Sequence, residues 1–212
     1  MKQAQIEPFL RLAPVMPVVT IEDAGLAPDL ARALVRGGIR VIEVTLRTAA
    51  ALRAIEAIAR DEPDICVGAG TVLSLSDLHA AAAAGAAFAI SPGATPGLLA
   101  AGMHATIPYL PAVATASELM NALAAGYTCF KLFPAAAAGG IPLLKSFAGP
   151  FPEARFCPTG GITPETARGY LEQSNVLCVG GSWLTPEDAL AARDWVRIET
   201  LASKAAAALR PA

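Results

Sequence analysis

Residues 37–47 read Gly37-Gly38-Ile39-Arg40-Val41-Ile42-Glu43-Val44-Thr45-Leu46-Arg47, and they join the end of a helical pattern to a strand. The two glycines stop the alanine-rich pattern of residues 26–36, as glycines at helix C-termini do. The following residues alternate between apolar and polar side chains, which is the period of a strand. The stretch is therefore one helix-to-strand unit, and the rest of the chain repeats it.

Short apolar runs alternate with longer helical patterns about eight times along the chain. Strands are predicted at residues 15–19, 40–45, 65–70, 87–91, 106–110, 128–133, 155–159 and 176–181. Helical patterns between them include 26–36, 49–60, 75–84, 117–124, 164–172 and 186–208. Ser76 with Asp77, and Thr163 before a proline, are typical of helix starts.

Such alternation without a break in composition predicts an α/β fold, with a parallel sheet closed into a single (β/α)8 TIM barrel over residues 1–212. Ile6 and Leu10, at helical spacing, predict a short N-terminal helix that covers one end of the barrel. A doubly wound open sheet is the alternative, but it usually has fewer strands and a glycine-rich dinucleotide fingerprint. The run Gly68–Leu73 lacks the third glycine of that fingerprint.

Composition narrows the classes of function. The chain is 54% hydrophobic, yet no apolar stretch approaches the roughly 20 residues of a membrane-spanning helix. Residues 1–5 are mostly polar and lack the apolar core of a signal peptide, so a cytoplasmic location is expected. The net charge is −2 and there is no basic run, which argues against nucleic acid as a partner.

The cysteine pattern argues against a metal site and against disulfides. Each cysteine falls in a separate predicted strand, and none belongs to a C-x-x-C pair. His79 and His104 lie in helical stretches away from those strands. We therefore expect no metal site. The thiols are expected to be reduced and to act as small buried hydrophobes at Cys66, Cys129, Cys157 and Cys178.

Lys131 is the residue that points most directly to chemistry. It lies in the apolar run Cys129-Phe130-Lys131-Leu132-Phe133-Pro134, which is predicted to be a strand. A buried ammonium is costly, so a lysine there is expected to lose its proton readily, and a neutral amine attacks a ketone or aldehyde to form a Schiff base. The alternative is a structural lysine paired with a buried carboxylate.

Alternation along the strands predicts which side chains share the interior. Ile42, Val44 and Leu46 suit the helix layer, which leaves Glu43, Thr45 and Arg47 facing inward or toward the mouth. The same reasoning directs inward Cys129, Lys131, Phe133, Thr71, Thr159 and Ser182. Several of these polar residues end strands, and barrel enzymes keep their active sites at the carboxyl ends of the strands.

Glu43 and Arg47 each have two interpretations. Glu43 is either the ion-pair partner of Lys131 or the proton shuttle for carbinolamine formation and carbon–carbon cleavage. Arg47 offers a guanidinium fork suited to a carboxylate, although an ordinary surface arginine would need no role.

The last two predicted strands end in glycine pairs, Gly160-Gly161 and Gly180-Gly181, the second followed by Ser182. Loops after the seventh and eighth strands of a barrel frequently bind phosphate through backbone N–H groups. A turn alone explains one such pair. Two pairs, with the Ser182 hydroxyl, favour a phosphorylated small-molecule substrate.

Several stretches together resemble the 2-keto-3-deoxy-6-phosphogluconate (KDPG) and 4-hydroxy-2-oxoglutarate (KHG) aldolase family. The resemblance covers nearly the whole chain in the correct order. Its motifs are Ala33–Thr48, Val67–Leu73, Ile90–Gly93, Lys131–Ala135, Phe156–Ile162 and Gly180–Trp183. The chain departs from the family pattern at Ala112, after Pro111, and at Ala136–Ala138, which puts substrate tolerance and local loop shape in question.

The resemblance implies a metal-free and cofactor-free class I aldolase, usually a homotrimer, that cleaves KDPG reversibly to pyruvate and glyceraldehyde 3-phosphate in the Entner–Doudoroff pathway. It makes Lys131 the Schiff-base lysine and Glu43 the general acid and base. The pyruvyl part of the substrate is expected among Arg47, Thr71, Pro92, Phe133 and Thr159. The phosphate is expected at Gly161, Gly180, Gly181 and Ser182.

Three other functions fit the same sequence features. The substrate of a 2-keto-3-deoxy-6-phosphogalactonate aldolase differs from KDPG at one stereocentre, and no motif in the sequence distinguishes the two. A KHG aldolase needs no phosphate site. A barrel isomerase or sugar-phosphate synthase would use Lys131 only for its charge, and its reaction would form no covalent intermediate.

Overall fold

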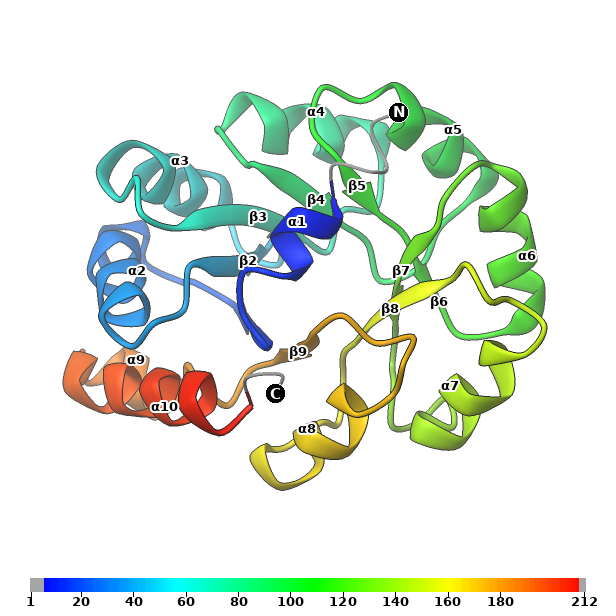
Figure 1. The fold of residues 1–212 in the computed structure, drawn as a ribbon. Coiled ribbons are helices and arrows are strands. Elements are labelled where there is room, and N and C mark those ends of the chain that lie inside the picture. Colours follow the sequence, from blue (N-terminus) through cyan, green and yellow to red (C-terminus); the bar gives the residue numbers. More distant parts are fainter. Residues whose placement is uncertain (1–5, 210–212) are drawn as a thin grey trace.

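Parallel strands occupy the interior and helices surround them in this computed structural model, which describes residues 6–209 (Figure 1). The strands are β1 Val15–Val19, β2 Val41–Thr45, β3 Cys66–Gly70, β4 Phe88–Ile90, β5 Tyr109–Leu110, β6 Ala112–Val113, β7 Cys129–Leu132, β8 Arg155–Pro158 and β9 Val179–Gly181. The helices are α1 Glu7–Leu10, η2 Ala24–Leu26, α2 Ala27–Arg36, α3 Ala51–Asp61, α4 Leu75–Ala83, α5 Pro96–His104, α6 Ala116–Ala124, α7 Gly140–Ala148, α8 Pro164–Leu171, α9 Glu187–Ala191 and α10 Trp195–Ala208. The polar start at residues 1–5 lies outside the described residues.

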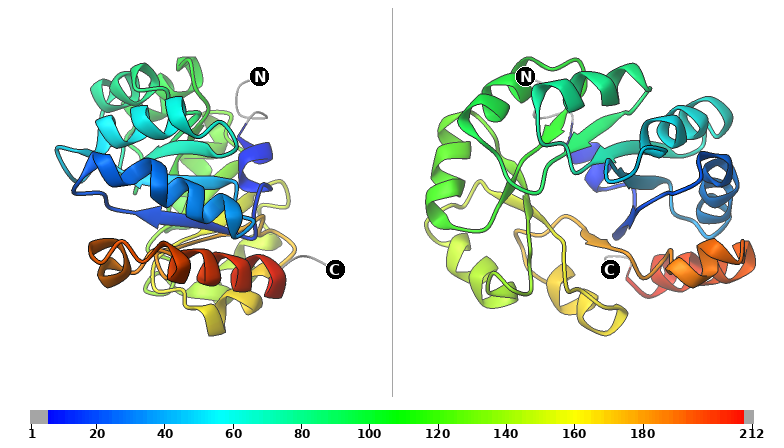
Figure 2. Two further views of the ribbon diagram at one scale, coloured as in Figure 1. Left: turned by 90° about the vertical axis from the view of Figure 1, so that its left-hand side faces the viewer. Right: turned by 180° about the vertical axis from the view of Figure 1, so that it is seen from behind.

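The strands form two parallel sheets. One has the order β5-β4-β3-β2-β1-β9, and the other has the order β6-β7-β8. Isolated bridges between Phe156 and Val176, and between Thr159 and Gly180, link the region of β8 to that of β9. Parallel pairing with a helix after most strands confirms the α/β class, and helices cover the outer faces (Figure 2).

The strand predicted at 106–110 extends further and is interrupted at Pro111. Tyr109 and Leu110 pair with β4, whereas Ala112 and Val113 pair with β7. Proline has no N–H to donate to a ladder, so it separates the two short strands. Its carbonyl oxygen still accepts a hydrogen bond from the Lys131 N–H at 2.9 Å.

Two details of the helix predictions are wrong, one division and one capping residue. The helix expected over 186–208 is two helices, because Arg193 adopts a left-handed conformation with φ 54° and the Asp194 side chain caps a new helix by accepting from the Arg197 N–H at 3.0 Å. Helix α4 begins at Leu75, as predicted, but its N-cap is Ser74 rather than Ser76, in a capping box with Asp77. Within residues 6–209, no helix combines the length and apolar character needed to cross a membrane.

Helix α1 confirms the short N-terminal helix, and it lies across one end of the strands (Figure 1). Its N-cap Ile6 and its last residue Leu10 are fully buried. The ring of Phe9 packs against that of Phe88, with centroids 5.2 Å apart. These apolar contacts connect α1 to β4 and close that end of the core.

We expect Gly68→Ala to destabilise the fold. A Cβ at this position of β3 would lie 2.0 Å from the Phe88 ring, and overpacking of this kind costs about 1–3 kcal/mol. Chemical denaturation should show a lower midpoint. The matched control is Gly97→Ala on the exposed face of α5, where the nearest atom is 4.0 Å away and stability should hold or rise slightly. Equal stability of both variants would contradict the tight contact.

Candidate active site

An ion pair between Lys131 and Glu43 lies at the centre of the candidate site. The Lys131 Nζ donates to the two Glu43 carboxylate oxygens at 2.9 and 3.1 Å, and the side chains are 6% and 2% exposed. Lys131 comes from β7 and Glu43 from β2, so the pair spans the interior between the two sheets. The prediction that both side chains face inward is confirmed.

The pair has the geometry of an ion pair and of a nucleophile with its base. Each partner satisfies the charge that burial of the other would otherwise leave uncompensated. A carboxylate at hydrogen-bond distance can also accept the ammonium proton and leave a neutral amine that attacks a carbonyl carbon. The structure thus brings Lys131 into contact with Glu43, the residue that the sequence suggested either as its ion-pair partner or as its proton shuttle.

Gly70 makes room for the Glu43 carboxylate. A Cβ at Gly70 would lie 2.2 Å from Glu43 Oε1, well inside van der Waals contact. Gly70 on β3 pairs with Thr45 on β2, two residues after Glu43, so Gly70 lies next to this part of β2. The missing side chain thus lets the carboxylate lie against the backbone of β3.

Aromatic and thiol groups complete the surroundings of the lysine. The Phe133 ring centroid lies 5.5 Å from the Lys131 Nζ, within range of a cation–π contact. Cys157 is the ladder partner of Lys131 on β8. A hydrogen bond with the buried Cys178 thiol lowers the pKa of Cys157, and the charge of Lys131 acts in the same direction.

A cavity of about 290 Å³ opens beside this pair. Seven residues predicted for the site line it, namely Arg47, Phe133, Thr159, Gly161, Gly180, Gly181 and Ser182. They come from the carboxyl ends of β2, β7, β8 and β9. Lys131 and Glu43 lie deeper, and Phe133, which contacts Lys131 and lines the cavity, connects the two regions.

The glycine pair after β8 shapes the wall of the cavity for close approach. Gly160 and Gly161 have φ angles of 100° and 73°, a left-handed region that favours glycine. A Cβ at Gly161 would meet the Ala136 Cβ at 2.7 Å. Backbone N–H groups in successive turn residues of this kind form concave anion sites, so the loop suits a phosphate.

Arg47 and Thr71 come together at the mouth, but Pro92 does not join them. The Arg47 Nε donates to Thr71 Oγ1 at 3.3 Å, and Thr71 adopts a left-handed φ of 59°, which is uncommon for a β-branched residue. Pro92 is half-buried after β4, and neither Pro92 nor Thr71 lines the cavity itself.

Sequence reasoning missed the cavity residues Thr20, Thr185 and Glu187. Thr20 directly follows β1, so it is a polar residue at the carboxyl end of a strand. The rule that found Thr71 and Thr159 would have found it, had it been applied to the first strand. Thr185 and Glu187 follow a turn after β9, and no periodic signal marks them.

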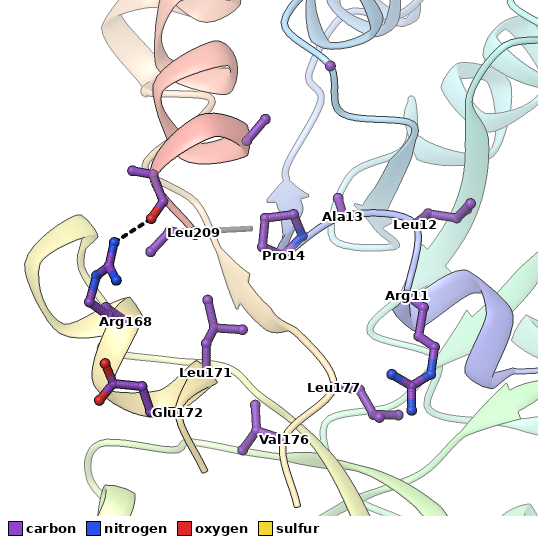
Figure 3. A pocket seen from close by; sticks show the side chains of 13 residues that line it. Arg11, Leu12, Ala13, Pro14, Arg168, Leu171, Glu172, Val176, Leu177 and Leu209 are labelled. Atoms are coloured by element: carbon purple, nitrogen blue, oxygen red, sulfur yellow. Dashed lines mark hydrogen bonds between the residues drawn. The ribbon is translucent and has the colours of Figure 1, made fainter. Parts of the chain in front are cut away.

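A larger cavity of about 770 Å³ lies at the opposite end of the strands (Figure 3). Its walls include Ala13, Pro14 and Leu177, which precede β1 and β9, and Arg168 reaches across to donate to the Ala208 carbonyl oxygen. The Lys131–Glu43 pair and the glycine pairs belong to the carboxyl ends of the strands. Chemistry is therefore assigned to the smaller cavity.

Comparisons with known proteins agree with this geometry. Residues 6–201 match the sequence profile of the family described as KDPG and KHG aldolase. The chain is 54% identical over 194 residues to a 2-dehydro-3-deoxy-phosphogluconate aldolase of Pseudoalteromonas atlantica, covering 92% of this chain and 90% of that protein. It is 52% identical over 199 residues to a KHG/KDPG aldolase of Escherichia coli, covering 94% and 93%.

Solved structures show the same similarity in three dimensions. A KDPG aldolase of Legionella pneumophila, with pyruvate captured as a covalent carbinolamine intermediate, has a TM-score of 0.93 and 49% identity, covering 94% of this chain and 97% of that one. A KDPG aldolase of Zymomonas mobilis with 3-phosphoglycerate has a TM-score of 0.93 and 47% identity, covering 99% and 98%. The chain belongs to the KDPG and KHG aldolase family, and it is a lyase of the aldolase type.

We expect Gly70→Ala to lower kcat about 100-fold while the protein stays folded, because the new methyl group displaces the Glu43 carboxylate from Lys131. Steady-state kinetics with circular dichroism measures both effects. Gly149→Ala, with no atom within 4 Å of the added Cβ, is the control and should keep full activity. An unchanged kcat in folded Gly70→Ala protein would show that the position of Glu43 does not limit the reaction.

Proposed function

We propose that the chain reversibly cleaves KDPG to pyruvate and glyceraldehyde 3-phosphate through a Schiff base on Lys131. The observation that carries the proposal is the buried Lys131 amine, 2.9 Å from the Glu43 carboxylate, beside a cavity walled by two glycine pairs. The relatives named as KDPG aldolases, and the pyruvate carbinolamine in the Legionella enzyme, support the same chemistry.

The reaction begins when the Lys131 nitrogen attacks the C2 carbonyl carbon and forms a carbinolamine. Glu43 takes the ammonium proton of Lys131 before the attack, a second nitrogen proton moves to the C2 oxygen to make the carbinolamine hydroxyl, and Glu43 then returns its proton to that hydroxyl, which leaves as water. The protonated imine then withdraws electrons as Glu43 removes the C4 hydroxyl proton. The C3–C4 bond breaks, glyceraldehyde 3-phosphate departs, and its bonding electrons remain in an enamine.

The second half of the reaction returns the enzyme to its starting state. Glu43 delivers the proton to C3 of the enamine, which gives the pyruvyl imine. Water adds to C2 and the C2–N bond breaks, so pyruvate leaves and the Lys131 amine reappears. One carboxylate can serve each proton transfer because Glu43 contacts the nitrogen in this structure, and the reacting atoms C2 to C4 lie within a few bonds of that nitrogen.

The remaining residues of the site hold the two ends of the substrate. Around the pyruvyl part we place Arg47, Thr71, Pro92, Phe133 and Thr159. Around the phosphate we place Gly161, Gly180, Gly181 and Ser182. Seven of these nine residues line one cavity, which supports this division, whereas Thr71 adjoins it through Arg47 and Pro92 is placed by the family resemblance alone. The Zymomonas enzyme with 3-phosphoglycerate supports a site for a phosphorylated three-carbon acid.

Cleavage of KHG is a second candidate activity. The Escherichia coli relative, 52% identical to this chain, is named for both substrates. KHG has no phosphate, so it would use Lys131 and Glu43 without the glycine pairs. The galactonate substrate differs from KDPG at one stereocentre and remains an alternative, since the comparable solved structure, at 24% identity, supports only the fold.

We further infer that the two sheets belong to one (β/α)8 barrel over residues 1–212, which form a single domain. Only Pro111 separates β5 from β6, and two bridges join the regions of β8 and β9. Homotrimeric assembly stays a prediction, supported by exposed Leu73 and Leu75 near the start of α4. The cytoplasmic location also stays a prediction.

Borohydride reduction in the presence of pyruvate should attach one pyruvate to the protein, as measured by intact mass. The adduct should be absent in Lys131→Met/Glu43→Gln, a double variant that avoids leaving one buried charge unpaired. Lys145→Ala removes an exposed lysine of α7 and should keep the adduct. A folded wild-type protein without an adduct would exclude the Schiff base and favour an isomerase or synthase.

We expect Gly161→Ala to raise the KM for glyceraldehyde 3-phosphate about tenfold or more in the aldol addition of pyruvate. The methyl group clashes with Ala136 and moves the N–H donors from the phosphate, whose charge makes such hydrogen bonds strong. The KM for glyoxylate, which has no phosphate, should change little. Gly149→Ala is again the control. Equal changes for both aldehydes would place the phosphate elsewhere.

A further inference from the structure

Two threonine hydroxyls meet at the mouth of the site. Thr20 directly follows β1 and Thr45 ends β2, and their Oγ1 atoms are 2.9 Å apart. Thr45 is 1% exposed, whereas Thr20 is exposed and lines the cavity. The chain after Thr20 is held in place because the Thr48 hydroxyl donates to the Ile21 carbonyl oxygen at 2.6 Å.

The hydrogen-bonding capacity of this pair extends into the cavity. A hydroxyl can donate one hydrogen bond and accept two. The buried Thr45 hydroxyl bonds to Thr20, which fixes the Thr20 side chain and still leaves it able to bond to a second group. Thr20 therefore presents an oriented hydroxyl on the cavity wall.

The sheet order places Thr20 between the two ends of the proposed substrate. Strand β1 lies between β9 and β2 in the six-stranded sheet. Its residue Pro17 pairs with Gly181, at the proposed phosphate site, and its residue Val18 pairs with Glu43, at the reacting carbons. The carboxyl end of β1 consequently faces the middle of a substrate that spans both.

We propose that Thr20, oriented by Thr45, determines specificity by hydrogen-bonding the C5 hydroxyl of the phosphorylated sugar acid. This inference rests on the proposed function, because it takes C2 at Lys131 and the phosphate at the glycine pairs. The C4 hydroxyl loses its proton in the reaction and belongs to Glu43. The C5 hydroxyl is unchanged by the reaction and lies between C4 and the phosphate, where Thr20 is.

The test compares two aldehydes of equal length in the aldol addition of pyruvate. Glyceraldehyde 3-phosphate carries the hydroxyl that becomes the one on C5, and 3-phosphooxypropanal lacks it. In Thr20→Val, kcat/KM for glyceraldehyde 3-phosphate should fall about tenfold, the effect of one lost hydrogen bond, and kcat/KM for 3-phosphooxypropanal should stay the same. Thr20→Ser should restore the preference, and Thr45→Val should weaken it partly.

Controls separate this role from the proposed function. Thr200→Val removes a hydroxyl that donates to the Val196 carbonyl oxygen on the exposed face of α10. It should leave kcat/KM unchanged for both aldehydes. Borohydride trapping of pyruvate should be unaffected in Thr20→Val. An equal fall for both aldehydes, or no fall, would overturn the role of Thr20. Wild-type protein that traps pyruvate but does not use glyceraldehyde 3-phosphate would overturn the proposed substrate, and the role of Thr20 with it.

Discussion

The buried ion pair between Lys131 and Glu43 is the interaction on which the rest of the site depends. Removing two charges from water is costly, and only close contact with good hydrogen-bond geometry compensates for it. The pair meets this requirement with contacts of 2.9 and 3.1 Å. Because Lys131 lies in the three-stranded sheet and Glu43 in the six-stranded sheet, the same contact that prepares the chemistry also connects the two sheets.

Small residues in the strands make this contact possible. Gly70 leaves room for the Glu43 carboxylate, and Gly180 leaves room for the Thr159 side chain, whose hydroxyl oxygen would lie 2.2 Å from an added Cβ. Parallel strands pack closely, so a large side chain that points inward needs a glycine beside it on the neighbouring strand. The glycines of β3 and β9 therefore serve the site as much as the fold.

The order of the strands also determines where each group of the site lies. Strand β2 carries Glu43, β7 carries Lys131, and the ends of β8 and β9 carry the glycine pairs. Strand β1 lies between β2, which carries Glu43, and β9, which carries the second glycine pair, and this order gives Thr20 its place between them. Since the carboxyl ends of parallel strands share one edge, residues far apart in the sequence converge there.

The alternation of apolar runs and helical patterns was sufficient to predict the α/β class, and period-two alternation was sufficient to direct Glu43, Lys131 and Thr159 inward. Both are local signals, because a side chain's face follows from its position in a strand. The change of pairing partner across Pro111 and the contact of Thr20 with Thr45 depend on neighbours distant in sequence, whereas the division at Arg193 has a local cap, Asp194, that the helical pattern overrode. The sequence by itself determined which residues could react, and only the tertiary structure decided which of them touch, because pairing across 88 residues is set by strand register and packing.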